Sequence, residues 1–551
     1  HRLVDARCPV ETLTQHPVDM LLAFDTLNNN KIPLPPQVFP ERRNSYGVNV
    51  DIESENAPFE AQVQAWLTKR WTAGPVINGE ALFESMIKAE QAMEIVKAPY
   101  DRRIEVGQVA YANLDHVSAA IEGAQHAFAC WNQTATATRS AALEKLANLL
   151  EDNLAELVAI CHQEAGKTIH DSIDEVREAV DFCRYYAKQV DALGELAVTS
   201  FDGQVRNVSR QGRGVFVCIS PWNFPLAIFL GQITAALVAG NTVVAKPAEQ
   251  TSLIAARAVE LMQQAGFPAG TIQLLPGRGA EIGSALTSHA AIAGVAFTGS
   301  TATAQRINQS LAERDAAPVP FIAETGGQNA MIVDSTALPE QVVRDVIRSA
   351  FASAGQRCSA LRVLYVQEDV ADRIVALIQG AMGELKVGTP YLHSTDVGPV
   401  IDQTAKTKLT AHLELMSQTQ HKVAQVELDE TCQHGDFVAP SAFEIDSIAC
   451  LKEEQFGPIL HIVRFKASEL ANVVAEINNT GYGLTMGIHS RNETTYRWIE
   501  KHARVGNCYI NRDQVGAVVG VQPFGGQGLS GTGPKAGGPH YLFRFTQTQF
   551  A

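Results

Sequence analysis

The sequence lacks the patterns that mark several large classes of protein. No uninterrupted apolar run reaches the ~18 residues that a membrane-spanning helix needs, so we expect no membrane span. The nine cysteines form no CxxC pair, which argues against a zinc ribbon or a thioredoxin-like site. They stand at positions 8, 130, 161, 183, 218, 358, 432, 450 and 508. This scattered, odd-numbered set is typical of a reducing compartment and predicts a cytoplasmic protein.

The chain also lacks an excess of basic residues. Its 44 Lys and Arg are outnumbered by 59 Asp and Glu, and the formal net charge is -15. Binding to nucleic-acid phosphates needs clustered Lys and Arg, so we expect no nucleic-acid partner. We also find no motif for a bound metal, no internal repeat and no low-complexity tract. What remains is an ordinary globular composition, and 551 residues are enough for two or more domains.

Residues 1–95 give the weakest structural signal. The run Pro33-Leu34-Pro35-Pro36 and the nearby Pro40 disfavour a helix, and they predict an extended arm or linker. Because the chain begins with His1 rather than Met, we expect it to be a fragment of a longer polypeptide.

From about residue 100 the pattern changes to alternating helices and strands. Leucines at helical spacing from Leu143 to Leu157 predict one amphipathic helix, and Ser172–Lys188 predicts another. Apolar runs of strand length then alternate with helical stretches, including a helix over Ser252–Ala265. The predicted strands are 214–219, 242–246, 271–275 and 292–297. Continuous β-branched runs between helices predict an α/β fold with a parallel sheet covered on both faces.

A second alternating section runs from Ala330 to about Val463. Its predicted strands include Ala330–Val333 and Leu361–Val366, so we expect a second α/β domain. The last stretch, Tyr541–Phe550, alternates large apolar with polar residues and predicts an edge strand.

The most informative cysteine lies in the run Gly355-Gln356-Arg357-Cys358-Ser359. Taken alone, Cys358 would more often be a buried structural cysteine, because free cysteines are commonly buried. Its small and polar neighbours favour a nucleophile instead. A free thiol has a pKa of ~8.5, so it is mostly protonated at neutral pH and needs help to react.

Two other runs offer that help. Glu324-Thr325-Gly326-Gly327 places a carboxylate before a glycine turn, and Glu324 is a candidate general base. Pro221-Trp222-Asn223-Phe224-Pro225 places the Asn223 amide on a stiff loop, where it could donate to an oxyanion. A solvated loop acid and an ordinary turn residue are the plain alternatives. Together the three residues supply the nucleophile, base and oxyanion donor of covalent carbonyl chemistry.

Candidate cofactor residues follow predicted strands. No GxGxxG fingerprint is present, since Gly277-Arg278-Gly279 followed by Gly283 does not match it. Phe297-Thr298-Gly299-Ser300 follows a strand and opens a helix, which suits a phosphate but is equally typical of a helix cap. Lys246 and Glu249 follow another strand and could reach ribose hydroxyls. A carboxylate at the 2′ position repels a 2′-phosphate and favours NAD over NADP.

These runs, with Pro523-Phe524-Gly525-Gly526 and Ser530-Gly531 near the end, closely resemble the motifs of the aldehyde dehydrogenase superfamily over roughly residues 100–550. The resemblance implies a Rossmann-like NAD-binding domain, an α/β catalytic domain and a small β oligomerisation flap. Their expected bounds are 96–192 and 214–323 for the NAD-binding domain, 324–524 for the catalytic domain, 193–213 and 525–551 for the flap, and 1–95 for the preceding arm.

Within the superfamily, the chain resembles the glutamate-γ-semialdehyde (1-pyrroline-5-carboxylate) dehydrogenases and, more narrowly, the C-terminal half of bifunctional proline utilization A proteins. Ser359 and the run from Thr532 to Tyr541 carry this likeness. It implies oxidation of glutamate γ-semialdehyde to glutamate through a cysteine thioacyl intermediate, with NAD as cofactor. It further implies a homodimer and a proline dehydrogenase module elsewhere in the parent chain.

The resemblance also assigns roles to individual residues. The substrate carboxylate is expected at the backbone N–H groups of Gly537 and Gly538, assisted by Ser359. Phe224 and Phe545 are expected to box the aliphatic chain. Glu178 is expected to face the α-ammonium group. The residues expected at the cofactor are Trp222, Lys246, Glu249, Gly279, Thr298, Gly299, Ser300, Glu454 and Phe456.

Other functions remain open on the sequence alone. The substrate could be another aldehyde, or the chain could be a non-catalytic scaffold with the same fold. The presence of Cys358 and Glu324 argues against the scaffold. CoA-acylating dehydrogenases and acyl-phosphate reductases need no hydrolytic base, so Glu324 counts against them as well.

Overall fold

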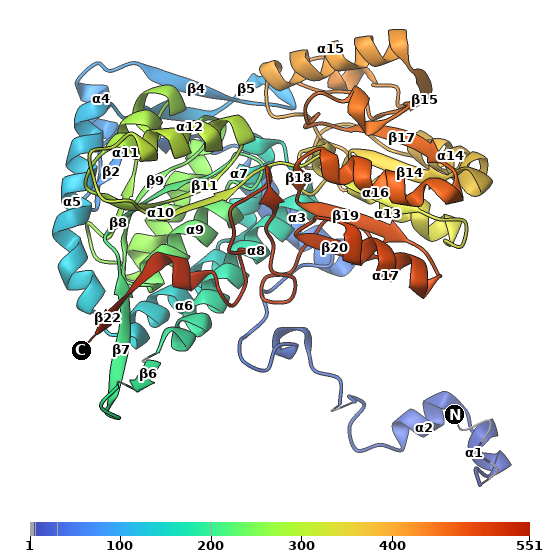
Figure 1. Cartoon of the computed structure of the whole chain (residues 1–551), viewed down its shortest axis with the longest axis horizontal. Coiled ribbons are helices and arrows are strands. Elements are labelled where there is room, and N and C mark those ends of the chain that lie inside the picture. The colour runs from blue at the N-terminus through green and yellow to red at the C-terminus, as the bar shows by residue number, and fades with distance from the viewer. Residues whose placement is uncertain (1–4, 6, 30, 195, 200, 551) are drawn as a thin grey trace. The chain divides into compact units, whose positions relative to one another are not determined.

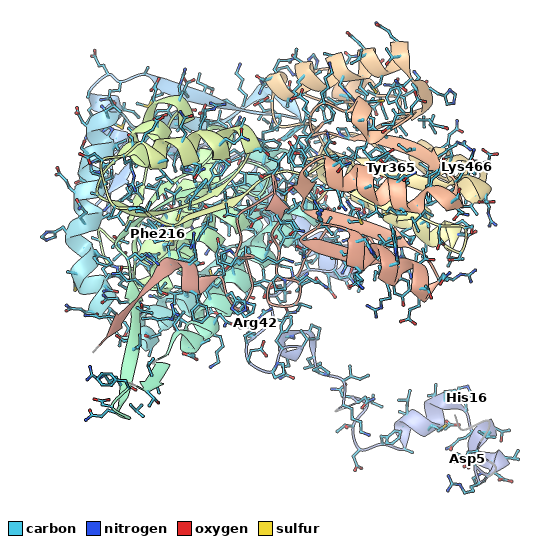
Figure 2. All side chains as sticks on the ribbon, viewed as in Figure 1. Asp5, His16, Arg42, Phe216, Tyr365 and Lys466 are labelled. Carbon is cyan, nitrogen blue, oxygen red and sulfur yellow. The ribbon has the colours of Figure 1, made fainter. Side chains whose placement is uncertain are left out.

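The computed structural model describes residues 5, 7–29, 31–194, 196–199 and 201–550, and it separates residues 1–46 from residues 47–551. Residues 1–46 contain short elements with mostly exposed side chains (Figure 2). These elements are helix α1 (Val10–Thr14), helix α2 (Pro17–Leu22) and a 3-10 turn (Pro35–Gln37). The predicted extended segment around the prolines is therefore interrupted by a turn.

The first large sheet of residues 47–551 has seven strands in the order β12-β11-β8-β9-β10-β2-β3. The five strands from β12 to β10 are parallel, and β2 runs antiparallel to β10. This confirms the parallel sheet that the apolar runs predict. The strands are β12 (Phe321–Glu324), β11 (Ile292–Thr298), β8 (Val215–Ile219), β9 (Thr242–Lys246), β10 (Ile272–Leu274), β2 (Val76–Ile77) and β3 (Glu80–Ala81).

Helices pack around this sheet (Figure 1). They are α5 (Leu114–Gln133), α6 (Thr136–Asp152), α7 (Leu154–Ala165), α8 (Ile169–Gln189), α9 (Ala227–Val238), α10 (Ser252–Ala265), α11 (Ser284–Ser288) and α12 (Thr301–Ala312). The leucine repeat from Leu143 to Leu157 spans two helices, not one. Asn153 separates them, and its side-chain amide donates to the carbonyl of Leu149 at 2.7 Å.

A second seven-stranded sheet forms the other half, in the order β15-β16-β17-β14-β13-β19-β20. Its strands are β15 (His421–Gln425), β16 (Ser441–Glu444), β17 (Ile459–Phe465), β14 (Val363–Gln367), β13 (Ala330–Val333), β19 (Thr485–His489) and β20 (Asn507–Ile510). The helices are α13 (Pro339–Phe351), α14 (Glu368–Gly383), α15 (Gln403–Thr419), α16 (Leu470–Asn479) and α17 (Glu493–His502). Each half has its own hydrophobic core, with Phe216 in the first and Tyr365 in the second (Figure 2).

Residues 47–95 differ from the predicted arm, because they belong to the folded body. They form α3 (Glu53–Trp66), β1 (Trp71–Ala73), α4 (Phe83–Lys88) and the first part of a β4 (Met93–Ala98) and β5 (Asp101–Ala110) hairpin. Strand β1 pairs with β5, and Phe59, Val63 and Trp71 are buried. The sequence did not reveal these elements because α3 contains Pro58, which disfavours a helix, and because the strands are short and pair with distant strands.

The C-terminal strand β22 (Thr546–Phe550) pairs with β7 (Val205–Gly212), which pairs with β6 (Leu196–Thr199). The expected flap is thus a three-stranded antiparallel sheet, whose role in dimerisation stays a prediction. The edge strand predicted from Tyr541 is wrong over its first half. There Leu542–Phe545 forms a 3-10 turn, which buries the side chains of Leu542 and Phe545 in the core. A further small pair joins β18 (Tyr482–Gly483) to β21 (Gln527–Gly528).

Candidate active site

Cys358 lies on a loop that follows α13 and a short turn at residues 352–355. The side-chain amide of Asn329 fixes this loop by donating to the carbonyls of Cys358 at 2.6 Å and Ala360 at 3.0 Å. The thiol is half-buried. Burial, together with the nearby carboxylates of Glu454 and Glu324, raises the pKa of Cys358 to about 12. The thiol is therefore protonated at neutral pH and needs a base before it can attack.

Glu324 ends strand β12, and its carboxyl group is almost fully buried. The N–H of Gly526 donates to its Oε2 at 2.9 Å, while no donor within the described chain reaches Oε1. Burial raises the pKa of Glu324 to about 8, against the lowering effect of the Gly526 N–H and of Lys535. A carboxyl group that titrates near neutral pH and keeps one oxygen uncommitted suits a general base.

The glycines of the late motifs allow the chain to approach Glu324. A side chain added at Gly525 or Gly531 would come within 2.7 or 2.8 Å of the Glu324 carboxylate. Glu324 also forms an isolated β-bridge with Gly531. The runs Pro523–Gly526 and Ser530–Gly531 therefore have a structural role that the sequence did not reveal: they enclose the candidate base.

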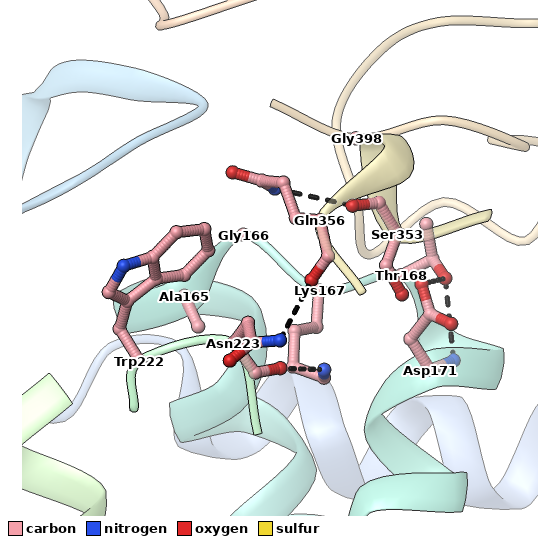
Figure 3. A pocket seen from close by; sticks show the side chains of 10 residues that line it. All are labelled: Ala165, Gly166, Lys167, Thr168, Asp171, Trp222, Asn223, Ser353, Gln356 and Gly398. Carbon is pink, nitrogen blue, oxygen red and sulfur yellow. Dashed lines mark hydrogen bonds between the residues drawn. The ribbon is translucent and has the colours of Figure 1, made fainter. Parts of the chain in front are cut away.

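The Asn223 side chain contacts the loop that carries Cys358. Its Nδ2 donates to the carbonyl of Gln356 at 3.1 Å, and Lys167 Nζ donates to the carbonyl of Asn223 at 2.8 Å. Figure 3 shows both contacts at a small pocket between the two halves. The pocket is lined by Ala165, Gly166, Lys167, Thr168, Asp171, Trp222, Asn223, Ser353, Gln356 and Gly398. The structure thus brings the candidate oxyanion donor into contact with the loop of Cys358.

The ends of β9 and β10 bring two predicted cofactor residues together. The N–H of Gly279 donates to Glu249 Oε1 at 2.7 Å. Lys246 is buried at the end of β9, and Nζ donates to the carbonyl of Pro247 at 3.0 Å. Burial lowers the pKa of Lys246 to about 8, although Glu249 opposes this shift. Glu249 is placed where a carboxylate could accept from ribose hydroxyls.

The end of β11 leads into the N-terminus of α12, as the sequence predicted. Ser300 caps the helix by accepting from the N–H of Thr303 at 3.2 Å. Thr298 Oγ1 accepts from Gln232 Nε2 at 3.0 Å. A side chain at Gly299 would lie 2.7 Å from the ring of Phe297, so only glycine fits without displacing that ring. The helix N-terminus offers N–H groups to a phosphate.

The remaining cofactor candidates lie nearer the nucleophile. Glu454 Oε1 accepts from Arg362 Nη2 at 2.9 Å, and Arg362 is fully buried. The rings of Trp222 and Phe456 meet edge-on with centroids 5.5 Å apart. Two carboxylates for riboses, a helix N-terminus for phosphates and an aromatic pair fit a nicotinamide dinucleotide.

The predicted carboxylate anchor is partly occupied by the protein itself. The N–H of Gly537 donates to the hydroxyl of Tyr186 on α8 at 2.9 Å. Gly538 accepts from the N–H of Tyr541, which folds the loop back on itself. Ser359 is buried next to Cys358. Of the predicted donors, Gly537 must exchange its present partner before it can bind a substrate carboxylate.

The two predicted aromatic residues have different surroundings. Lys167 Nζ lies 4.7 Å from the centre of the Phe224 ring, and the Arg357 guanidinium carbon lies 5.8 Å from it. The Phe545 ring is instead fully buried against Phe216 and Tyr541, at centroid distances of 4.8 and 5.2 Å. Phe224 thus lies beside two cationic side chains, whereas Phe545 packs in the core.

Glu178 lies on α8, half-buried. Burial and the neighbouring Glu175 raise its pKa to about 8, while Arg357 and Lys167 act in the opposite direction. The sequence alone does not identify these neighbours. Their signal was the acidic repeat Asp171, Asp174, Glu175 and Glu178, in which Asp171 and Glu175 are buried. Such a repeat indicates charges that need partners inside the protein.

Other site types have weaker support. In the described ranges, Asp51, His170 and His393 place ligand atoms within 4.8 Å of one another, but all three side chains are exposed. No helix of the described chain is long and apolar enough to cross a membrane. All nine cysteines are free.

The fold and the site together define an α/β protein with two halves. A cysteine, a carboxyl group and a side-chain amide lie close together in it, near the carboxyl ends of parallel strands, where α/β sheets bind dinucleotides. The profile of the aldehyde dehydrogenase family matches residues 86–551, and the chain belongs to that family. Members of this family use NAD or NADP.

Three relatives show where the chain lies within the family. It is 45% identical to the bifunctional protein PutA of Salmonella typhimurium, over 99% of this chain but 41% of that protein's length. It is 36% identical to the 1-pyrroline-5-carboxylate dehydrogenase of Anoxybacillus flavithermus, over 90% of this chain and 96% of the relative. A crystal structure of a Bradyrhizobium japonicum proline utilization A variant superposes with a TM-score of 0.88 at 48% identity, covering 100% of this chain and 52% of that one.

Proposed function

We propose that this chain oxidises L-glutamate γ-semialdehyde to L-glutamate with NAD. The semialdehyde arises when 1-pyrroline-5-carboxylate is hydrolysed, and its oxidation is the second step of proline catabolism. The observation that carries the proposal is the convergence of Cys358, Glu324 and Asn223, found in a chain whose full-length relative is named a 1-pyrroline-5-carboxylate dehydrogenase.

The chemistry assigns one step to each residue. The Cys358 sulfur attacks the aldehyde carbon, and the Asn223 amide and the Cys358 N–H donate to the oxygen that becomes negative. When bound, NAD accepts the hydride that leaves this carbon. A thioester on Cys358 remains. Glu324 then takes a proton from a water molecule, which attacks the thioester and releases the acid.

Because its pKa is raised, the Cys358 thiol needs a base that deprotonates it. Glu324 has an uncommitted oxygen and a pKa of about 8, so it is the first candidate. It would then act twice, once on the thiol and once on water. The two roles differ in timing, which transient kinetics can separate.

The head group of the proposed substrate carries a carboxylate and an ammonium group, and each needs partners in the protein. A carboxylate enclosed by protein needs several donors at once. Ser359, Gly538 and, after it leaves Tyr186, Gly537 are proposed as those donors. Phe224 would contact the methylene chain, with Phe545 supporting it from the core, and Glu178 would face the ammonium group.

We propose NAD rather than NADP because of Glu249. Its carboxylate already accepts from the Gly279 N–H at the end of the sheet. A 2′-phosphate at this position would meet a like charge, whereas ribose hydroxyls would donate to it. Similar kcat/KM values with NAD and NADP would remove Glu249 from this role.

The parent protein is proposed to be longer and dimeric. The chain spans 41% of the length of the bifunctional Salmonella relative. We propose that a proline dehydrogenase module of the parent chain supplies the substrate. We further propose that the β6-β7-β22 sheet joins two copies and that the protein acts in the cytoplasm.

The test is a product assay with NAD and glutamate γ-semialdehyde. NADH and glutamate should form in equal amounts, and neither should form with Cys358→Ala. Oxidation of other aldehydes without any oxidation of the semialdehyde would identify another substrate. No NADH with any aldehyde would favour the scaffold.

A further inference from the structure

The backbone just before the nucleophile has an unusual conformation. Ser353, Ala354 and Gly355 have φ values of 54°, 53° and 66°, all in the left-handed region. Residues with side chains rarely adopt this region, and two in succession persist only where the surroundings hold them. The turn lies between α13 and Cys358, so its geometry fixes where the nucleophile loop begins.

Buried arginines hold this turn. Arg357 Nε donates to Ser353 Oγ at 3.0 Å, and Arg362 Nη1 donates to the carbonyl of Gly355 at 2.6 Å. Arg362 Nη2 also donates to the carbonyl of Arg357 at 3.0 Å. Since Arg357 directly precedes Cys358, its side-chain position bears on the nucleophile.

Arg357 is held in turn from the other half of the molecule. Its Nη2 pairs with Asp171 Oδ1 at 2.5 Å, and the two side chains are only 10% and 8% exposed. The second oxygen of Asp171 accepts from Thr168 Oγ1 at 3.0 Å, as Figure 3 shows. Asp171 lies in the first turn of α8, and this helix packs in the hydrophobic core of the first sheet. The ion pair therefore joins the nucleophile loop to the half that carries Asn223.

The segment leading into α8, together with the first turns of that helix, also holds the loop of Asn223. Lys167 Nζ donates to the carbonyl of Asn223 and lies 3.1 Å from Glu175 Oε2. Glu175 Oε1 accepts from the N–H groups of Leu226 and Ala227 at 3.0 and 2.8 Å. One stretch of chain, residues 167–175, thus contacts both the nucleophile loop and the oxyanion loop.

We propose that Asp171 is a positioning residue: by holding Arg357, it sets the placement of Cys358 relative to Asn223. The inference rests on the proposed thiol chemistry but not on the identity of the aldehyde. The role is one of position rather than charge, because the main charges that act on the Cys358 thiol are the carboxylates of Glu454, Glu324 and Glu178.

A double-mutant cycle with propanal and NAD tests this. Asp171→Asn and Arg357→Gln should each lower kcat ~10- to 100-fold, because small misplacements of reacting groups are that costly. The double variant should lose no more than the worse single variant, since both changes break one contact. The KM for NAD should stay within ~2-fold. Asp174→Asn is the matched control: this acid lies on the same helix but is 59% exposed, and it should keep its kcat.

Two further measurements separate positioning from other roles. The double variant removes both charges, so the pH profile of Cys358 alkylation by iodoacetamide should not shift, although kcat stays low. A shifted profile, additive losses, or losses confined to KM would overturn the proposal. If the Asp171 variants fail to fold, Ser353→Ala decides, because it removes the one hydroxyl that accepts from Arg357 Nε and also hydrogen-bonds Asp171. A several-fold fall in kcat supports the proposal, and an unchanged kcat overturns it. Using propanal keeps the outcome independent of whether glutamate γ-semialdehyde is the substrate.

Discussion

The cofactor side and the nucleophile side of the site are built in different ways. On the cofactor side, strand ends and backbone groups form most of the contacts. The Gly279 N–H donates to Glu249, and a residue larger than glycine at position 299 would displace the Phe297 ring. On the nucleophile side, buried ion pairs connect distant segments. Asp171 and Arg357, for example, lie 186 residues apart in the chain. Local backbone motifs tolerate changes in the surrounding charges. A buried ion pair does not, because the loss of one partner leaves the other charge buried without compensation.

The largest effect is expected at the nucleophile itself. Cys358→Ala should abolish NADH formation, because no other group can form the covalent intermediate. Binding of NAD, measured by titration, should change less than ~2-fold if the cofactor side is independent of the thiol. Cys450→Ala, at an exposed cysteine of the same half, is the control and should behave like the unmodified protein. Substantial residual turnover in Cys358→Ala would refute the assignment.

The next largest effect is expected at the base. Glu324→Gln should lower steady turnover ~10²- to 10⁴-fold, the range typical of general-base loss. Stopped-flow measurements should still show a burst of NADH, because hydride transfer precedes hydrolysis of the thioester. Loss of the burst as well would mean that Glu324 acts earlier, on the Cys358 thiol.

The pH dependence follows from the same carboxyl group. Burial raises the pKa of Glu324 to about 8, so the group is mostly protonated, and inactive as a base, below that pH. Where deacylation limits the rate, kcat should rise as pH increases through about 8 and then level off. The rise should be absent in Glu324→Gln. An identical rise in that variant would assign the titration to another group.

A smaller effect is expected on the cofactor side. Gly299→Ala places a methyl group 2.7 Å from the Phe297 ring, which must move. We expect NAD to bind roughly 10-fold more weakly, equivalent to about 1.4 kcal/mol, with kcat nearly unchanged at saturating NAD. Gly380→Ala, where a methyl group meets nothing within 4 Å, is the control. A large fall in kcat in Gly299→Ala would show that the two sides are more strongly coupled than their contacts suggest.

The same contrast explains what the sequence could predict. Long apolar runs such as Thr242–Lys246 determine strands locally, because a strand buried on both faces needs them. The segment from Phe297 to Ser300 is equally local, and its strand-to-helix turn is present in the structure. The short strands within residues 47–95 depend on distant partners, and no local pattern predicts such pairing.

Other features escaped the sequence for similar reasons. The partners of Arg357 and Gly537 are side chains on α8, more than 180 positions earlier in the chain for Arg357 and 351 positions earlier for Gly537. Phe545 looked like a strand residue because it stands among alternating apolar positions, but burial against Phe216 places it in a turn. Only the folded chain reveals these contacts.

The most direct test of the account compares kcat/KM for glutamate γ-semialdehyde and propanal in the unmodified protein. The account predicts at least a ~100-fold preference for the semialdehyde, because several donors meet its carboxylate and each charged hydrogen bond is worth about 1.5–3 kcal/mol. Ser359→Ala should lower the value for the semialdehyde much more than the value for propanal. Similar kcat/KM values for the two aldehydes in the unmodified protein would contradict the account and identify a general aldehyde dehydrogenase.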